Sequence, residues 1–180
     1  MVKIKLVLIM NTKFSELVQY FREIATQHIA IGHSATENHF YRFEIDEVLI
    51  GLKTVNYPAL ILEGYRCNLI DNKSDNILKD RTGAFILLDH LTDLGDFDTM
   101  HAIWDRLEGI ADDIVIRIKK DKRNAQSQVI RDFDLSSVEY TLIANEQDKN
   151  FGVRCTFKIL TPFSGDCDET KWNYEAVIAV

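Results

Sequence analysis

The chain has 180 residues, of which 46% are hydrophobic and 27% are charged, and its formal net charge at pH 7 is −7. This composition is typical of a globular protein and excludes an intrinsically disordered chain. The acidic balance argues against a general nucleic-acid binder, because phosphate binding requires an excess of Lys and Arg. At this length we expect one domain, with a core large enough to fold without disulfides or metals.

The cysteines and the N-terminal residues bear on the compartment in which the protein is found. Cys67, Cys155 and Cys167 are widely separated and show neither CxxC nor Cys/His spacing, so a zinc site is not predicted and a reducing compartment is favoured. The opening MVKIKLVLIM has an apolar run too short to span a bilayer and no small-residue cleavage site. Its alternation predicts a strand, so we expect residues 1–12 to form an N-terminal extension or an edge strand.

A first amphipathic helix is predicted from about residue 13 to residue 30. Its apolar residues recur with the helical period. They are Phe14, Leu17, Val18, Phe21, Ile24, Ala25 and Ile29, with His28 in the same stripe. Asn11 and Thr12 are suited to cap its first turn, and Gly32 suits its exit.

Two strands are predicted between this helix and the next. Residues 33–46 suggest a turn followed by a short strand or irregular link. ALILEGYRCNLI, residues 59–70, predicts a strand in which Gly64 marks a bulge. The polar residues 69–83 predict a hairpin link, and AFILLDHL, residues 84–91, predicts a second and more deeply buried strand.

The stretch DFDTMHAIWDRLEGIADDIVIRI, residues 96–118, contains six acids, one His and one Trp. Either the acids converge on a substrate, or they line the solvated side of a helix. The apolar residues decide between these, because they fall on one helical stripe. They are Met100, Ile103, Trp104, Leu107, Ile110, Ala111, Ile114, Val115 and Ile118. Asp105, Glu108 and Asp112 lie on the flank away from the stripe, so an amphipathic helix with solvated acids is predicted and Trp104 is interpreted as a core residue.

The residues at both ends of this stretch also support the prediction of a helix. Asp96 or Asp98 is suited to cap its first turn. Lys119, Lys120 and Lys122 follow its end, where positive charge complements the helix dipole.

The remaining residues predict paired strands and a terminal segment. SSVEYTLIAN, residues 136–145, and FGVRCTFKIL, residues 151–160, are joined by a polar EQDKN turn. Residues 161–180 are expected to form a C-terminal loop and arm. Together the elements predict a single α+β domain, residues 13–160, with a mostly antiparallel β-sheet packed by two long amphipathic helices.

Two groups of residues could bind a metal, and both have a simpler interpretation. His28, His33 and His39 are spaced by five and six residues, which is no known metal-binding geometry, so structural histidines are favoured. Asp166 and Asp168 could hold a divalent cation together with a third carboxylate, although a polar turn is the favoured interpretation.

Two further patterns are similarly unspecific. Asp71, Asp75 and Asp80 resemble a calcium loop but lack the glycine and terminal Glu of an EF-hand. Asp89 and His90 are the best acid/base pair in the chain, but adjacent side chains on a strand point to opposite faces. No P-loop, Rossmann, GxSxG or HExxH motif occurs. We therefore predict no catalytic, cofactor-binding or metal-binding residues and a protein that is not an enzyme.

The order of elements resembles the phage tail-terminator (tail-completion) proteins and their relatives in the head–tail neck. That order is an amphipathic helix, a Pro-marked strand, a polar hairpin, a second apolar strand, an acid-capped helix and a terminal hairpin. The resemblance rests on FSELVQYFREIA, NYPALILEGY, GAFILLDHL, FDTMHAIWDRLEGIADDI and FGVRCTFKIL. It covers most of residues 13–160 as a pattern of elements, without a short motif, and leaves residues 1–10 and 161–180 without a counterpart.

The resemblance implies a structural virion protein of the tail and neck, made in the host cytoplasm. Its subunits would form a hexameric ring that caps the tail tube and joins it to neck and connector proteins, while DNA passes through the lumen without specific binding. An acidic chain suits that lumen. No membrane partner and no cofactor are implied.

Three alternatives remain open at this point: another head–tail connector protein, an effector or immunity-type binding module, and a small metal-dependent hydrolase using Asp166 and Asp168. The strand-like ends VKIKLVLI and NYEAVIAV are candidate arms that cross to a neighbouring subunit or to the tail tube.

Overall fold

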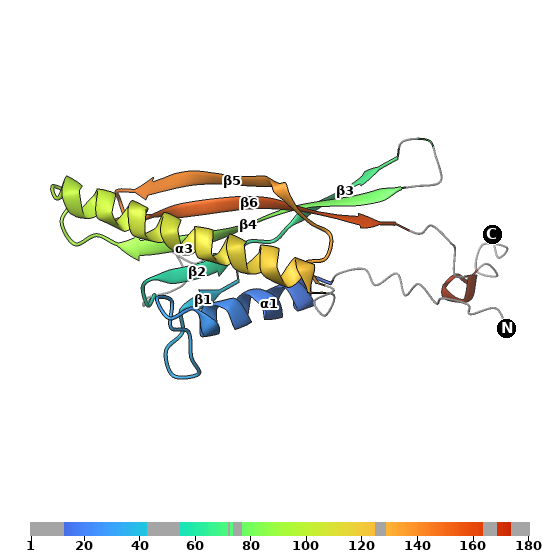
Figure 1. Cartoon of the computed structure of the whole chain (residues 1–180), viewed down its shortest axis with the longest axis horizontal. Coiled ribbons are helices and arrows are strands. Elements are labelled where there is room, and N and C mark those ends of the chain that lie inside the picture. The colour runs from blue at the N-terminus through green and yellow to red at the C-terminus, as the bar shows by residue number, and fades with distance from the viewer. Residues whose placement is uncertain are drawn as a thin grey trace, which may run out of the picture.

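The computed structural model describes residues 13–42, 55–71, 73, 77–124, 129–163 and 169–173. Within these ranges, two helices and six strands form the body of the protein (Figure 1). In chain order they are α1 (Phe14–Gln27), β1 (Phe40–Tyr41), β2 (Ala59–Leu62), β3 (Arg66–Ile70), β4 (Leu78–His90), α3 (Phe97–Arg123), β5 (Phe133–Asn145) and β6 (Asn150–Pro162). A short 3-10 helix, η1 (Glu169–Lys171), follows.

The strands form one mixed sheet with the order β1-β2-β4-β6-β5. β3 also pairs with β4 and lies after β2 along the same side of that strand. Only β1 and β2 run parallel, whereas every other pair in the described ranges is antiparallel. The predicted fold class, a single α+β domain with a mostly antiparallel sheet and two amphipathic helices, agrees with this arrangement.

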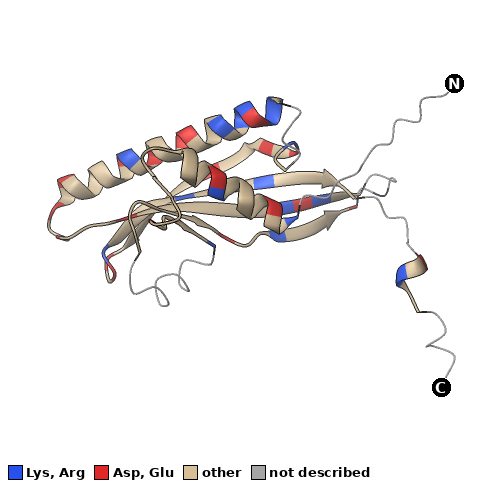
Figure 2. Ribbon diagram, turned by 90° about the horizontal axis from the view of Figure 1, so that it is seen from below, with Lys and Arg blue, Asp and Glu red and all other residues tan. Residues whose placement is uncertain are grey.

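Both long helices lie against the same face of the sheet (Figures 1 and 2). Along β6, alternate residues point toward the helices and are buried, as the two-residue period of a strand requires. These residues are Phe151, Val153, Cys155, Phe157 and Ile159. Phe157 stacks on Phe133 and Phe21, so one aromatic cluster ties β6 to β5 and to α1.

A second, smaller apolar cluster lies on the other face of the sheet. It consists of Tyr41, Ala59, Ile61, Ile86 and Leu88, with Val55, Tyr57 and Ile143 packed against it. The middle of β4 is therefore buried on both faces, which explains the continuous apolar run AFILL in its sequence.

The first helix is shorter than predicted. It ends at Gln27 because His28 leaves the helical conformation, and Gly32 follows with a φ of 68°. Ile29, which the periodic pattern placed in the apolar stripe, is 98% exposed, so that part of the prediction is wrong. At the other end, the Glu16 carboxylate accepts a hydrogen bond from the Lys13 backbone at 2.9 Å. The predicted caps Asn11 and Thr12 lie outside the described residues.

The bulge predicted at Gly64 is confirmed. Leu62 pairs with Phe85 and Arg66 pairs with Thr82, so three residues face two on β4. The extra residue divides the predicted strand 59–70 into β2 and β3.

The second predicted strand is longer than expected. β4 begins at Leu78, so the last part of the predicted hairpin link is strand. Lys79 pairs with Leu69 on one side and with Thr161 on the other, and these partners hold the polar residues in the sheet. Non-local pairing here overrides a composition that favours a loop.

The second half of the chain agrees well with prediction. Asp96 caps α3 by accepting a hydrogen bond from the Thr99 backbone, and the helix continues to Arg123. Its buried residues are Ile103, Leu107, Ile110, Ala111, Ile114 and Ile118, as the stripe predicted. β5 and β6 are paired but extend beyond their predicted bounds, and β6 ends two residues past the predicted domain boundary.

Candidate assembly surfaces

The three histidines singled out in the sequence do not form one site. His39 donates its backbone N–H to Nδ1 of His33 at 3.3 Å, and its own Nδ1 lies 3.0 Å from the Pro58 carbonyl oxygen. His28 lies instead at the end of α1, with Nε2 3.4 Å from Asp113 on α3. Burial lowers the pKa of His33, which favours its neutral form. His33 and His39 thus stabilise the same loop, and His28 contacts α3 instead.

The predicted acidic groups are likewise separated. Asp71 accepts a hydrogen bond from the Lys73 backbone, and Asp80 lies on β4 with Lys158 3.1 Å away. Asp89 forms an ion pair with Arg106. Asp75, Asp166 and Asp168 lie outside the described residues, so the predicted pair at 166 and 168 is not placed. Within the described part of the chain, no three His, Cys, Asp or Glu side chains gather as a metal site would require.

His90 and the three cysteines complete the candidates. His90 is exposed and stacks on Tyr57 at 5.8 Å, separate from the Asp89–Arg106 pair, as opposite faces of a strand require. Cys155 is buried under the helices, and burial raises the pKa of its thiol to about 12. Cys67 is exposed on β3, whereas Cys167 is not among the described residues. The buried thiol is therefore held protonated, a poor state for a nucleophile.

Several acids of α3 bond to neighbouring elements, which sequence reasoning missed. Asp112 accepts a hydrogen bond from the Tyr140 hydroxyl of β5 at 2.9 Å. Asp121 accepts one from the Tyr20 hydroxyl of α1 at 3.1 Å, and Arg117 binds the same carboxylate at 2.7 Å. These acids join α3 to α1 and β5. No local signal marks them, because their partners on α1 and β5 lie far away in the chain.

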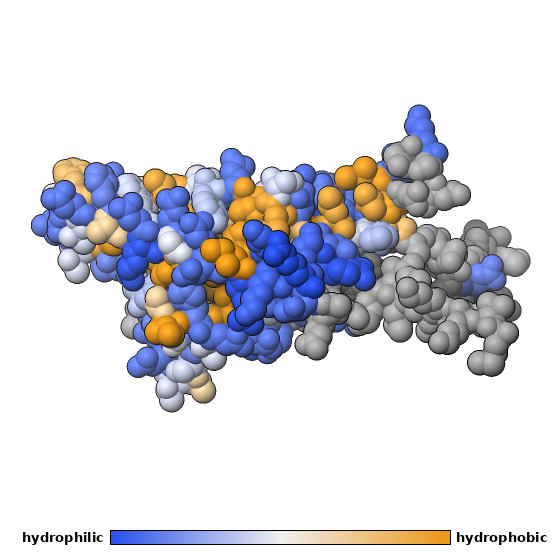
Figure 3. Space-filling view, viewed as in Figure 1, coloured by the Kyte–Doolittle hydropathy of each residue, from blue (hydrophilic) through white to orange (hydrophobic). Residues whose placement is uncertain are grey.

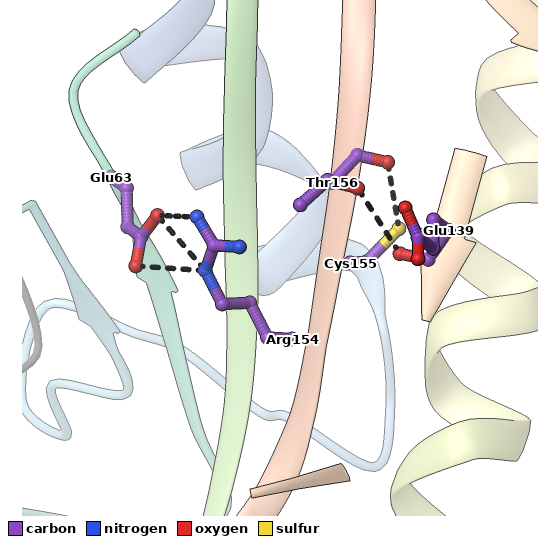
Figure 4. A network of polar contacts seen from close by, with 5 residues as sticks. All are labelled: Glu63, Glu139, Arg154, Cys155 and Thr156. Atoms are coloured by element: carbon purple, nitrogen blue, oxygen red, sulfur yellow. Dashed lines mark hydrogen bonds and ion pairs between the residues drawn. The ribbon is translucent and has the colours of Figure 1, made fainter. Parts of the chain in front are cut away.

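The sheet face opposite α1 and α3 carries two ion pairs. Arg154 on β6 contacts both carboxylate oxygens of Glu63, with the shortest distance 2.6 Å (Figure 4). Lys158 pairs with Asp80, whose second carboxylate oxygen is buried without a hydrogen-bond partner among the described residues. The two long cationic side chains of β6 are thus each neutralised by a carboxylate of a neighbouring strand.

Two features hinder strand pairing along the outer edge of β5. The Trp104 indole of α3 donates a hydrogen bond to the Ile143 carbonyl oxygen at 3.0 Å and packs edge-on against Phe151. Between Asp134 and Glu139 the register with β6 shifts, because four residues of β5 face one of β6. An irregular strand and an occupied carbonyl both hinder another strand from pairing here.

The outer edge of β3 has the opposite character. All five of its residues are exposed, and β4 is its only strand partner within the described part of the chain. Leu69 and Ile70 are 56% and 44% exposed. The β3–β4 hairpin extends past the ends of both helices (Figure 1), and apolar side chains appear at the surface on this side of the body (Figure 3).

The two ends of α3 differ in charge. Asp96 and Asp98 lie at its start, whereas its last turn carries Lys120, Lys122 and Arg123 (Figure 2). Lys122 is engaged within the fold, since its ammonium group donates to the Phe133 carbonyl oxygen. These basic residues therefore stabilise the end of α3 and its connection to β5.

Comparisons with family models, with curated proteins and with solved structures found no match. Among the helices in the described ranges, none combines the length and the apolar character that crossing a membrane requires. The surfaces described above are therefore the features on which a functional proposal must rest.

Proposed function

We propose that this chain is a structural subunit of a phage or phage-like tail, a tail terminator whose ring caps the tail tube and joins it to the neck. Its partners are further copies of itself, six to a ring by the family resemblance, together with tail-tube and neck proteins. Its place is the virion, and its work is assembly without catalysis.

The division of the sheet into two unlike faces supports this proposal. One face is covered by α1 and α3, whereas the other carries the neutralised pairs Glu63–Arg154 and Lys158–Asp80. A surface that faces passing DNA must not bind its phosphates. Protein cations bind DNA by neutralising phosphates and releasing the counterions of the DNA, and a cation that is already paired with a carboxylate does not do this. The paired charges on the face opposite α1 and α3 therefore have the electrostatic character that the lining of a ring needs.

The native mass and the particle shape test the proposal. We expect light scattering to give a mass several times the 20.8 kDa of one chain, and electron microscopy to show closed rings that bind the end of purified tail tubes. A ring that binds the connector but not the tube would assign the chain to another position in the neck. A chain that stays monomeric, or one that hydrolyses a substrate with divalent cation and loses this activity in Asp166→Asn, would overturn the proposal.

The DNA-facing role has a test of its own. Glu63→Gln leaves the Arg154 guanidinium without its carboxylate, so we expect retention on double-stranded DNA at low salt to increase. Glu139→Gln is the matched control, because it removes one exposed negative charge from the same face without releasing a cation that the structure pairs with it. Equal retention of both variants would show that only net charge matters and that the Glu63–Arg154 pair has no special part.

A further inference from the structure

We infer that the outer edge of β3 pairs antiparallel with β3 of a second copy, so that two sheets join across a two-fold axis. The contact is isologous, with the same five residues on both sides. It is distinct from the head-to-tail contacts that close a ring, so it does not depend on the proposed function.

The state of the edge is the first argument. A strand at the side of a sheet presents unpaired N–H and C=O groups, and proteins normally protect them with charges, prolines, bulges or covering elements. β3 contains no proline and a single charge, Arg66, and its bulge lies before the strand and not within it. Leu69 and Ile70 instead offer apolar surface to a partner.

The register is the second argument, and it identifies the partner as β3 itself. Centring the pair on Asn68 places all five residues opposite a partner, with Cys67 facing Leu69 of the other copy and Arg66 facing Ile70. Cys67 and Leu69 both lie on the helix side of the sheet, since they pair with Arg81 and Lys79 of β4. The apolar pairs therefore share one face, and the two Arg66 side chains lie at opposite ends, where they do not repel each other.

The closure of β5 is the third argument. A head-to-tail pairing of β3 with β5 of another copy would require the β5 backbone to be free. Trp104 already occupies the Ile143 carbonyl oxygen, and the register shift between Asp134 and Glu139 interrupts the strand. The hairpin extends past the ends of α1 and α3, so neither of these helices covers it there (Figure 1).

A cross-link tests the register directly. In a Cys67→Ser, Cys167→Ser background, Asn68→Cys places two thiols opposite each other at the centre of the pair. Directly opposite residues of antiparallel strands have Cα atoms about 4.5–5.5 Å apart, within the range that a disulfide spans. We expect a covalent dimer after mild oxidation. Thr141→Cys in the same background is the control on β5 and should remain uncross-linked.

Substitution of the exposed leucines tests the contact without covalent trapping. Leu69 and Leu142 are 56% and 52% exposed on β3 and β5, so they form a matched pair. We expect Leu69→Lys to weaken concentration-dependent association by about tenfold, because a lysine protects a strand edge from pairing, and Leu142→Lys to leave it unchanged. Melting temperatures of both variants should stay near that of the unsubstituted chain, which separates assembly from folding.

The results separate this inference from the proposed function. Rings that form while the Asn68→Cys variant stays uncross-linked overturn the two-fold contact and leave the ring intact. Cross-linked dimers without rings support the contact and count against the tail terminator. If the edge instead receives a strand from a different protein, the chain alone stays monomeric at every concentration without a cross-link, and the inference fails.

Discussion

β5 and β3 lie on opposite sides of the central β4–β6 pair, and they meet the solvent in different ways. β5 runs beside α3, whose Trp104 occupies an edge carbonyl and whose Asp112 binds Tyr140. β3 lies on a hairpin that extends past the helices, with every residue exposed. Both are outer strands of one sheet, so strand character alone does not decide whether an edge is available. What decides it is the presence of a neighbouring element that can reach the edge backbone.

The largest effect is expected at Trp104, the side chain through which α3 bonds to the edge of β5. Trp104→Ala removes the packing against Phe151 as well as the bond to Ile143, so it should lower the free energy of unfolding by about 3–5 kcal/mol. Trp104→Phe keeps an aromatic ring and loses the indole N–H, so its loss should be about 1 kcal/mol. Denaturant titration of both variants measures this. If they are equally destabilised, the hydrogen bond and not the packing holds α3 on β5.

Two glycines sharpen the comparison between the sheet interior and the β3 side. A Cβ at Gly152, on β6, would lie 2.1 Å from the Leu87 carbonyl oxygen, whereas one at Gly64 would meet nothing within 4 Å. Gly152→Ala should therefore be destabilised by about 1–3 kcal/mol or more, because the β4–β6 pair must separate. Gly64→Ala should stay within about 0.5 kcal/mol. Thermal unfolding of the pair checks this, and a silent Gly152→Ala would show that the close contact does not exist.

A smaller, pH-dependent effect is expected at Tyr140. Burial, followed by the hydrogen bond to Asp112, raises the pKa of Tyr140 well above its ordinary value of 10.0. Because the folded pKa is the higher one, the stabilisation is complete below pH 10 and is lost as the pH rises above it. Tyr140→Phe should lose about 1 kcal/mol at pH 7 and decline less steeply in alkali.

Melting temperatures from about pH 7 to pH 11 measure this dependence, since the range spans the ordinary tyrosine pKa. Tyr20→Phe serves as a comparison, because the pKa of Tyr20 is raised as well. An unchanged alkaline slope in Tyr140→Phe would contradict the assignment.

The smallest effect is expected on the solvated flank of α3. Asp105 is exposed, and Asp105→Asn should change the free energy of unfolding by no more than about 0.5 kcal/mol. Leu107, two positions along, is fully buried, so Leu107→Ala serves as the positive control and should be destabilised by about 2–5 kcal/mol. If Asp105→Asn unfolds the protein while Leu107→Ala is silent, the orientation of the helix is wrong.

The sequence alone was enough to predict the elements whose side-chain pattern is local. The predicted stripe of α3 includes every residue of the helix that the structure buries, while Met100, Trp104 and Val115 are partly buried, and Gly64 marks the bulge between β2 and β3. The paired strands around EQDKN were also predictable. A helix or strand imposes its period on the residues that it contains, so packing on one face can be recognised from spacing.

Tertiary structure decided the rest, because it depends on partners distant in the chain. The polar start of β4 is a strand only because β3 and β6 pair with it, and Ile29 is exposed because α1 ends before the stripe does. Glu63 meets Arg154 across 91 residues of sequence, a pairing without a local signal. The same holds for the two edges: β5 and β3 both have the sequence pattern of strands, and only the tertiary position of α3 brings Trp104 to the β5 backbone, whereas no described helix reaches β3 in this way.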